Sequence, residues 1–252
     1  GAEMVVKTLE KNGVKVVFGY PGAANCPIID KLSFSSIKHI LTRNEQGAAH
    51  MASGYARVTK QAGVCTATSG PGATNLITGI ATAYMDSIPM VALTGQVATK
   101  LIGKDAFQEV DITGATLPFT KHSYLIKDGL DIPRVVNEAF HIANTGRPGP
   151  VLIDFPMDLL KKEFDYPDED EDVNIRGYKL MGKANESQVK KVAEAIKGAK
   201  KPVILAGGGV VISDATNEFR KFVKETDIPV VSTMMGIGIL PSDNPRYYGM
   251  IG

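Results

Sequence analysis

The sequence predicts an α/β fold in which a parallel β-sheet is flanked by helices and followed by an incomplete second α/β domain. Two observations support this prediction. Short apolar runs rich in β-branched residues alternate with segments of helical periodicity along most of the 252 residues. Glycine-rich turns follow several of the apolar runs, where strands of a parallel sheet pass into helices. Repeated strand–turn–helix units of this length are typical of a sheet that helices cover on both faces.

The first part of the chain supplies most of these units. Helical periodicity predicts helices over residues 2–11, 27–32, 45–59 and 132–144, and a further helix that residues 69–75 open and that runs through Met85. Apolar, β-rich runs predict strands over residues 14–18, 37–42, 63–68, 90–94, 123–126 and 151–154. Residues 98–117 are less regular. We expect them to form a long excursion, and ordered loops of that length are more often functional than not.

The composition changes after Pro156. Residues 163–172 are nearly all acidic, which predicts a solvated linker between domains. The predicted organisation is therefore a first domain over residues 1–160, a linker over 161–184 and the start of a second α/β domain over 185–252. In that second domain we expect helices over 187–197 and 215–225 and strands over 202–206 and 229–233. The chain opens without an initiator Met, already inside a helical pattern, and closes without a domain-ending signal, so we expect it to be a fragment of a longer protein.

Composition excludes several classes of protein. Hydrophobic residues make up 44% of the chain and charged residues 22%, as in a soluble globular protein. The net charge of +1 gives no field that would attract nucleic acid. No apolar run is long enough to span a bilayer, and no signal peptide is present, so we expect no membrane partner and a cytoplasmic location, or an organelle matrix if a transit peptide was removed. Cys26 and Cys65 lack metal-ligand spacing, and no residue of this chain is expected to bind a metal.

Glu45 has the most informative position in the sequence. It follows the apolar residues 39–42 and begins the predicted helix 45–59, so it falls where a parallel strand passes into a helix. Ligands bind at that edge of open α/β sheets, which makes Glu45 a candidate for acid–base chemistry. The alternative is that Glu45 only interacts favourably with the dipole of its helix. This stretch by itself favours the alternative.

Four predicted strands end in glycine-rich loops. These loops are residues 19–22, 69–75, 207–209 and 235–238. Such turns expose backbone N–H groups and let a flat or phosphate-bearing ligand approach the chain. None has the spacing of a phosphate-binding P-loop, and residues 207–209 lack the Gly-x-Gly-x-x-Gly spacing of dinucleotide-binding folds. Their number favours one or two large cofactors at the strand ends.

Several segments together resemble a known family. Residues 19–22 (GYPG), 43–48 (RNEQGA) and 67–76 (ATSGPGATNL) resemble the pyrimidine-binding domain of thiamine-diphosphate enzymes. Residues 105–111 (DAFQEVD) and 145–151 (TGRPGPV) narrow the resemblance to the catalytic subunit of biosynthetic acetolactate (acetohydroxyacid) synthases. The resemblance covers the whole chain, which corresponds to about the N-terminal half of such a subunit.

The resemblance implies a role for each matching residue. Glu45 would hydrogen-bond N1′ of the cofactor's aminopyrimidine ring in a site walled by Gly47, Ala48 and Ala49, and Gln108 would lie near the reacting centre. Phe107 would lie at the mouth of the active site. The pyrimidine pocket would be lined by Tyr20, Pro21, Gly22, Thr68, Pro71 and Asn75. FAD, without a redox role, would contact Arg147, Gly207, Gly208, Gly209, Thr233, Met234, Met235, Ile251 and Gly252.

The implied reaction is the condensation of two 2-keto acids with loss of CO₂. Pyruvate would condense with a second pyruvate or with 2-oxobutyrate, in the first common step of branched-chain amino-acid biosynthesis. The implied cofactors are thiamine diphosphate, Mg²⁺ and FAD. The family binds Mg²⁺ through a Gly-Asp-Gly…Asn motif that this chain lacks, so we expect the chain by itself to be inactive. The implied assembly is a homodimer or a higher homo-oligomer, and the resemblance leaves open a regulatory small subunit.

Other interpretations remain open at this point. In one alternative, the pocket residues are only turn and cap residues, Gln108 is a loop anchor and Arg147 is a surface arginine. The second alternative is another thiamine-diphosphate enzyme, such as a catabolic acetolactate synthase, a pyruvate oxidase or a decarboxylase. A non-catalytic cofactor-binding module is the third alternative, which Glu45 disfavours because binding a pyrimidine does not require a proton-sharing carboxylate.

Overall fold

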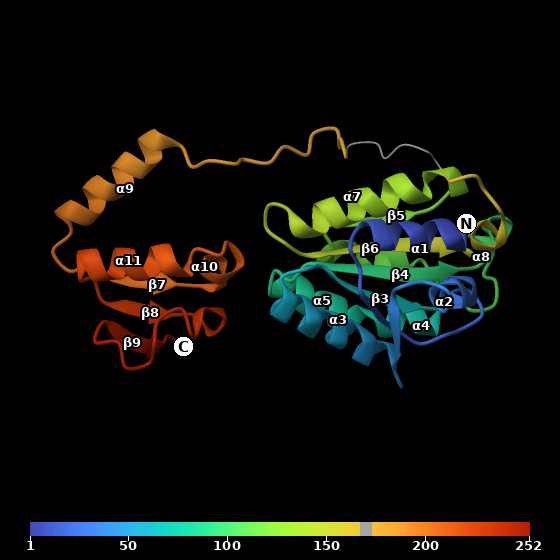
Figure 1. Cartoon of the computed structure of the whole chain (residues 1–252), viewed down its shortest axis with the longest axis horizontal. Helices are drawn as coiled ribbons and strands as arrows, with labels where there is room; N and C mark the ends of the chain where they lie inside the picture. The colour runs from blue at the N-terminus through green and yellow to red at the C-terminus, as the bar shows by residue number, and fades with distance from the viewer. Residues whose placement is uncertain (167–172) are drawn as a thin grey trace. The chain divides into compact units, whose positions relative to one another are not determined.

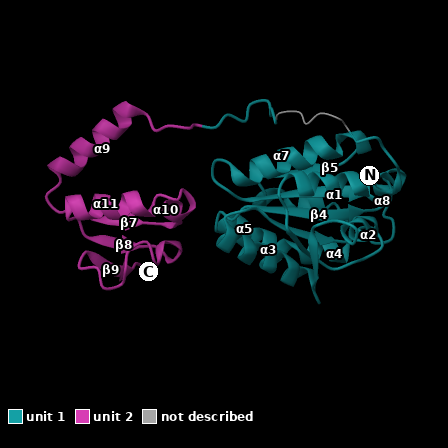
Figure 2. Cartoon of the chain, viewed as in Figure 1, with its two compact units in different colours: residues 1–180 teal, residues 181–252 magenta. Residues whose placement is uncertain are grey.

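A computed structural model describes residues 1–166 and 173–252. They form two compact units, Gly1–Leu180 and Met181–Gly252 (Figure 2). The division thus falls inside the predicted linker 161–184, and most of that segment belongs to unit 1. Aromatic side chains explain this, because Tyr166 lies 3.2 Å from the Thr8 hydroxyl and Tyr178 lies 2.9 Å from the Thr145 hydroxyl. The middle of the predicted linker, residues 167–172, lies outside the described residues.

Six described strands of unit 1 form one parallel sheet in the order β2-β1-β3-β4-β6-β5. The strands are β1 (Val16–Gly19), β2 (Lys38–Leu41), β3 (Gly63–Ala67), β4 (Met90–Gln96), β5 (His122–Leu125) and β6 (Pro150–Pro156). Every residue of β3, β4 and β6 is buried, as the continuous apolar runs require. The predicted parallel sheet is confirmed.

Helices cover both faces of this sheet (Figure 1). One face packs against α1 (Ala2–Lys11), α2 (Cys26–Leu32), α7 (Ile132–Asn144) and α8 (Met157–Lys161). The other face packs against α3 (Glu45–Thr59), α4 (Pro71–Asn75), α5 (Ile77–Met85) and α6 (Ile112–Thr116). Short 3₁₀ turns lie at η1 (Thr99–Leu101), η2 (Leu117–Phe119) and η3 (Gly129–Asp131). The helices α3 and α4 and the segment between β4 and α6 carry most of the candidate site residues of unit 1.

The structure differs from the predicted elements between β3 and α6. The single helix expected through Met85 is two helices that meet at Leu76, which is the C-cap residue of α4 and whose side chain is fully buried in the core. The excursion expected over 98–117 contains η1 and α6 as well as loops. The strand ends themselves lie in register, with Ala67 opposite Thr94 and Gln96 opposite Pro156. Loops that follow these strands therefore meet at one edge, which we call the carboxyl edge.

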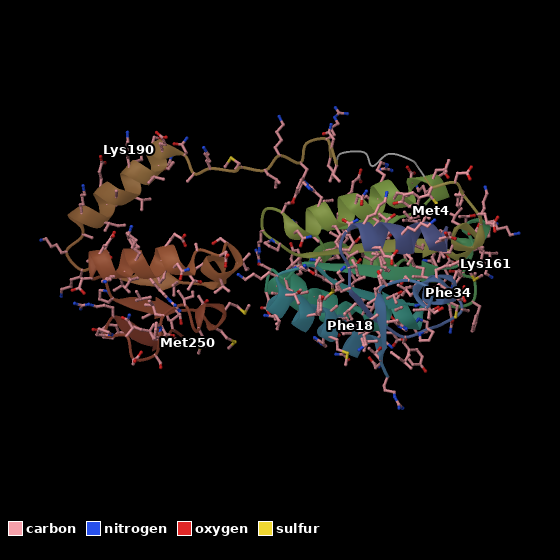
Figure 3. The ribbon with its side chains drawn as sticks, in the orientation of Figure 1. Met4, Phe18, Phe34, Lys161, Lys190 and Met250 are labelled. Carbon is pink, nitrogen blue, oxygen red and sulfur yellow. The ribbon has the colours of Figure 1, made fainter. Side chains whose placement is uncertain are left out.

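Unit 2 has a smaller parallel sheet of three described strands, in the order β7-β8-β9. Its elements are β7 (Ile204–Ala206), β8 (Val230–Ser232), β9 (Tyr247–Met250), α9 (Glu186–Gly198), α10 (Gly208–Ile212), α11 (Thr216–Thr226) and η4 (Met234–Gly236). The strand β9 was not predicted, because a glycine, Gly249, interrupts its short sequence. In the structure Gly249 has a φ of 91°. Within the described residues α9 buries no side chain, and Lys190 projects from it (Figure 3).

A candidate cofactor site at the carboxyl edge

The loop Ser69–Asn75 is the centre of the candidate site, because other loops of the carboxyl edge contact it or the residue before it. The first of these is the turn that carries Tyr20, Pro21 and Gly22. The Ala24 N–H donates a hydrogen bond of 3.1 Å to the Thr68 hydroxyl, which fixes this turn beside the end of β3. The structure thus brings together the residues that the sequence assigned to a pyrimidine pocket from β1 and β3.

The side chain of Asn25 stabilises the same turn through hydrogen bonds. This residue was not identified from the sequence. Its side chain is fully buried. Its Oδ1 accepts from the Gly22 N–H at 2.7 Å, and its Nδ2 donates to the Tyr20 carbonyl at 3.1 Å and to the Thr66 hydroxyl at 3.3 Å. Asparagine side chains often hydrogen-bond nearby backbone groups in turns, so an asparagine directly after the glycine turn was the available signal.

Replacing Asn25 by Ala is expected to lower the free energy of unfolding by about 2 to 3 kcal/mol, because three partly or fully buried polar groups lose a partner at once. Urea unfolding followed by circular dichroism measures this. The matched control is Asn12→Ala, since Asn12 makes a comparable bond of 2.7 Å to Asn137 nearer the surface. Equal stability losses for the two variants would contradict the role assigned to Asn25.

Glu45 is the first residue of α3 and is linked to the central loop. The Asn44 side chain caps the helix by accepting from the Gln46 N–H at 2.8 Å. The Asn75 Nδ2 donates to Glu45 Oε2 at 2.9 Å, so the end of α4 orients the carboxylate. Glu45 and Asn75, which are thirty positions apart in the sequence, therefore meet as one polar pair at the carboxyl edge.

The three residues predicted to wall the site of Glu45 lie in different environments. Ala48 and Ala49 are fully buried, but they belong to the core between α3 and the sheet. A side chain at Gly47 would meet no other atom within 4 Å, so this position faces open space. Residues three and four positions after Glu45 lie on the same side of the helix as Glu45, one turn further along, where they pack in the core. Glu45 itself is half-buried and can be approached from the edge.

Gln108 lies against the central loop. Both Gly70 and Gln108 have positive φ, 58° and 56°. A Cβ on Gly70 would lie 2.6 Å from the Gln108 carbonyl oxygen, so this approach requires glycine. The Glu109 carboxylate folds the segment around Gln108 by accepting from the Gly103 and Ala106 N–H groups, and these bonds lower the pKa of Glu109. Phe107 beside it is 88% exposed.

The predicted FAD residues of unit 2 converge at the carboxyl ends of β7 and β8. The Thr233 N–H donates to the Ala206 carbonyl at 2.9 Å, and the Ile251 N–H donates to the Ser232 carbonyl at 2.9 Å. A Cβ on Gly208 would lie 2.9 Å from Cβ of Met235, so the two glycine loops are in contact. A larger residue at position 208 would fill the space between the two loops. The absence of a side chain there suits a ligand that lies against the backbone.

Arg147 lies away from the carboxyl edge. It precedes β6 and is therefore at the amino edge of the sheet in unit 1, opposite to Glu45. Its Nε donates to the Ser87 hydroxyl at 2.7 Å, and the group is exposed. The structure does not bring Arg147 together with the other predicted residues of unit 1, and its assignment to FAD stays a prediction.

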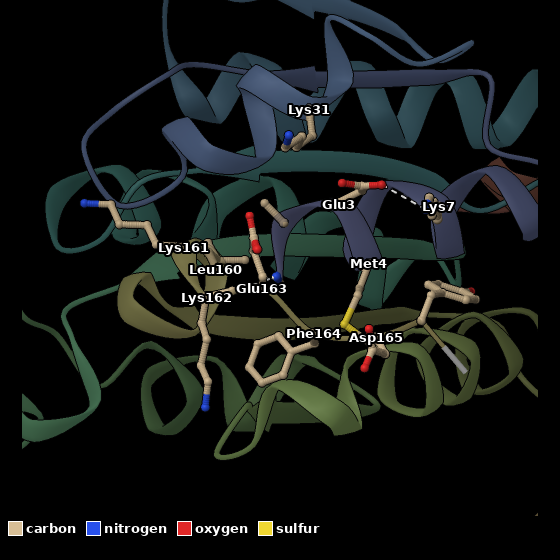
Figure 4. A pocket seen from close by; sticks show the side chains of 13 residues that line it. Glu3, Met4, Lys7, Lys31, Leu160, Lys161, Lys162, Glu163, Phe164 and Asp165 are labelled. Carbon is tan, nitrogen blue, oxygen red and sulfur yellow. Dashed lines mark hydrogen bonds and ion pairs between the residues drawn. The ribbon is translucent and has the colours of Figure 1, made fainter. Parts of the chain in front are cut away.

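A cavity of about 530 Å³ lies apart from these residues, beside the start of α1 (Figure 4). It is lined by Gly1, Ala2, Glu3, Met4, Lys7, Lys31, Leu160, Lys161, Lys162, Glu163, Phe164, Asp165 and Tyr166. Glu3 and Lys7 form an ion pair of 2.8 Å across part of it. Charges of both signs line the cavity, so it favours no single class of ligand.

Two further features bear on function. Across the described ranges 1–166 and 173–252, no group of three or more His, Cys, Asp or Glu side chains is arranged to hold a metal ion. Of the helices in the described part of the chain, none has both the length and the apolar character needed to cross a lipid bilayer. The candidate site therefore offers an organic cofactor a carboxylate, an amide and open backbone, without a metal centre among the described side chains.

Comparison with known proteins gives consistent matches in both units. The chain matches the model of the thiamine pyrophosphate enzyme N-terminal TPP binding domain over residues 1–115 and that of the central domain of these enzymes over residues 189–252. It is 53% identical to a probable acetolactate synthase large subunit of Methanocaldococcus jannaschii, 52% to an acetolactate synthase of Mycobacterium bovis and 49% to an acetolactate synthase large subunit of Buchnera aphidicola.

Each of these matches covers all of this chain but only 43%, 41% and 44% of the respective relatives. The chain thus spans less than half the length of the curated relatives that it matches. The two family models nevertheless describe successive domains of the same enzymes, in the same order as units 1 and 2. The chain belongs to the thiamine pyrophosphate enzyme family.

Proposed function

We propose that the full-length protein containing this chain is an acetolactate synthase that condenses two 2-keto acids with loss of CO₂. The observation that carries the proposal is the Glu45–Asn75 pair of 2.9 Å at the carboxyl edge. Three relatives near 50% identity with acetolactate synthase names support the substrate class, pyruvate with a second pyruvate or 2-oxobutyrate.

Glu45 is the proposed acid–base residue. Asn75 occupies Oε2 and leaves Oε1 free to meet N1′ of the aminopyrimidine ring. When bound, thiamine diphosphate supplies the carbon nucleophile that adds to the keto group. Glu45 would hold a proton and share it with N1′. A carboxyl group at the entrance of a site that a cofactor covers is suited to this role. Because Glu45 is half-buried in this chain, its shielding would come from the cofactor and from protein beyond the described residues.

The remaining residues would bind and orient. The turn Tyr20–Gly22, with Thr68 and Pro71, would line the pyrimidine pocket, since the Ala24–Thr68 hydrogen bond fixes its two sides. Gln108 would donate a hydrogen bond to the keto acid near the reacting centre, and the exposed Phe107 ring would cover the site mouth. Mg²⁺ would be held with the diphosphate outside the described residues, since these provide no ligand cluster.

FAD is proposed as a second cofactor, at the junction of residues 207–209 with residues 233–235. The Gly208→Val variant is expected to lose most of its flavin, because Cβ of residue 208 would already lie 2.9 Å from Met235. The measurement is the absorbance of released flavin per mole of purified full-length protein. Gly198→Val is the control, since a Cβ there meets no other atom within 4 Å. Full flavin content in Gly208→Val would contradict this site.

The proposed partners follow from the same comparison. We propose a homodimer or a higher homo-oligomer in the cytoplasm, and the term large subunit in the relatives' names supports a regulatory small subunit as a further partner. The net charge of +1 supports small-molecule substrates over nucleic acid.

The test of the proposed function is product identity. Full-length protein supplied with thiamine diphosphate, Mg²⁺, FAD and pyruvate is expected to release acetolactate and CO₂ in a ratio of one to one. Release of acetate would indicate an oxidase, and release of free acetaldehyde would indicate a decarboxylase. Either result would overturn the proposal.

A further inference from the structure

Two buried polar side chains at the ends of the central strands have no role in the function proposed above. Gln96 is the last residue of β4 and is 4% exposed, and Asp154 lies in the neighbouring strand β6 and is 1% exposed. Polar groups are costly to bury unless they are hydrogen-bonded. A carboxyl group and an amide in this otherwise apolar layer therefore require specific partners.

The amide of Gln96 joins the two ends of the segment that carries Gln108. Its Oε1 accepts from the Val97 N–H at 2.9 Å, where the segment leaves β4. Its Nε2 donates to the Val110 carbonyl at 2.8 Å, where the segment reaches α6. One side chain thus closes the loop of residues 97–110, and Gln108 lies two residues before the second attachment.

Asp154 determines how that amide is oriented. Its Oδ2 accepts from Gln96 Nε2 at 2.8 Å, and its Oδ1 accepts from the Thr94 hydroxyl at 2.7 Å. If the amide were rotated by half a turn, Oε1 would face the Val110 carbonyl, Nε2 would face the Val97 N–H, and Oδ2 of Asp154 would lose its donor. The carboxyl oxygen therefore selects the orientation in which Gln96 holds both ends of the loop.

We infer that Asp154 is a positioning residue that acts through Gln96 on the loop 97–110 and so sets the position of Gln108 over the central loop. The inference rests on the proposed function for the role of Gln108 in the reaction. Hydrogen bonds to Glu109 fold the loop internally, and contact with Gly70 places it against the site. Thr99 ties the start of the loop to Asp158 in α8, and the Asp154–Gln96 pair connects the loop to the buried centre of the sheet.

Two substitutions separate positioning from packing. Asp154→Leu keeps the volume and removes the acceptor, whereas Asp154→Asn can accept from Gln96 through its carbonyl and donate to Thr94 through its amide. In the full-length enzyme, Asp154→Leu is expected to lower kcat/KM for pyruvate by about 10- to 100-fold. Flavin content and affinity for thiamine diphosphate should stay unchanged, and Asp154→Asn should keep near wild-type kcat/KM. Equal losses in both variants would overturn the inference.

A double-substitution cycle tests whether the effect passes through Gln108. If it does, Asp154→Leu added to Gln108→Ala should cause little further loss of kcat/KM. Losses that multiply would overturn the inference, because they would mean that Asp154 acts independently. Thr8→Val is the matched control, since it removes a buried hydrogen bond of 2.7 Å on the opposite face of the sheet and should leave the kinetics unchanged.

Hydrogen exchange distinguishes failure of this inference from failure of the proposed function. In Asp154→Leu, backbone amides of residues 97–110 are expected to exchange at least about tenfold faster than in Asp154→Asn, whether or not the protein makes acetolactate. Equal exchange rates in the two variants would overturn the positioning role. Absence of acetolactate from wild-type protein, with the exchange difference intact, would overturn the proposed function instead.

Discussion

Replacing Glu45 by Gln in the full-length enzyme is expected to lower the rate of acetolactate formation by about 10²- to 10⁴-fold. Gln has the same shape and can still accept the hydrogen bond that Asn75 donates, so α3 and α4 should keep their arrangement. What the amide lacks is a proton to share with N1′ of the cofactor. The affinity for thiamine diphosphate should therefore change much less than kcat.

The control for this substitution is Glu10→Gln. Glu10 also accepts hydrogen bonds through its carboxylate, from the N–H and hydroxyl of Ser36, but it lies in α1 away from the carboxyl-edge loops. Its removal should leave the rate of acetolactate formation unchanged. A Glu45→Gln enzyme with a near wild-type rate would exclude acid–base catalysis by Glu45.

The free energy of unfolding of the wild-type chain is expected to fall by about 4 kcal/mol, relative to Asp154→Asn, as the pH rises from about 4 to 7. Burial raises the pKa of Asp154 from 3.8 to about 7. The hydrogen bonds from Thr94 and Gln96 lower this pKa, and the nearby charge of Asp111 raises it, but burial has the largest effect. Between these values the unfolded chain releases the proton and the folded chain keeps it. Rising pH therefore favours unfolding until Asp154 also ionises in the folded state.

Urea unfolding of the two chains at several pH values measures this difference. Asp111 itself is held in its ionised form by hydrogen bonds from the Gly114 N–H and the Thr113 hydroxyl, which lower its pKa, so it should not titrate within the same window. If the free energies of unfolding of wild type and Asp154→Asn changed with pH in the same way, the assignment of a raised pKa to Asp154 would be contradicted.

Sequence patterns predicted most of the fold because the fold has simple physical requirements. Strands buried on both faces must be apolar throughout, and β3, β4 and β6 have that pattern. The helix predicted over residues 45–59 is α3 of the structure, where Asn44 provides the N-cap and Lys60 the left-handed C-cap. Given parallel strands, the position of Glu45 at the carboxyl edge followed from the chain order.

The remaining features depend on contacts between segments that are distant in sequence. Gln96 and Asp154 are separated by 58 positions, and their pairing depends on which strands are neighbours. Polar residues inside apolar strand runs were the available signal. The burial of Ala48 and Ala49 depends on which side of α3 packs against the sheet, and the small residues of this helix leave that choice undetermined in the sequence.

The central claim is that Glu45 activates a thiamine cofactor bound at the carboxyl edge. The most direct measurement is the rate at which the C2 proton of bound thiamine diphosphate exchanges with deuterium from solvent, followed by quenched-flow NMR on the full-length protein. Wild-type protein should accelerate this exchange strongly over the free cofactor, and Glu45→Gln should return it to nearly the rate of the free cofactor. Equal acceleration by wild type and Glu45→Gln would contradict the claim.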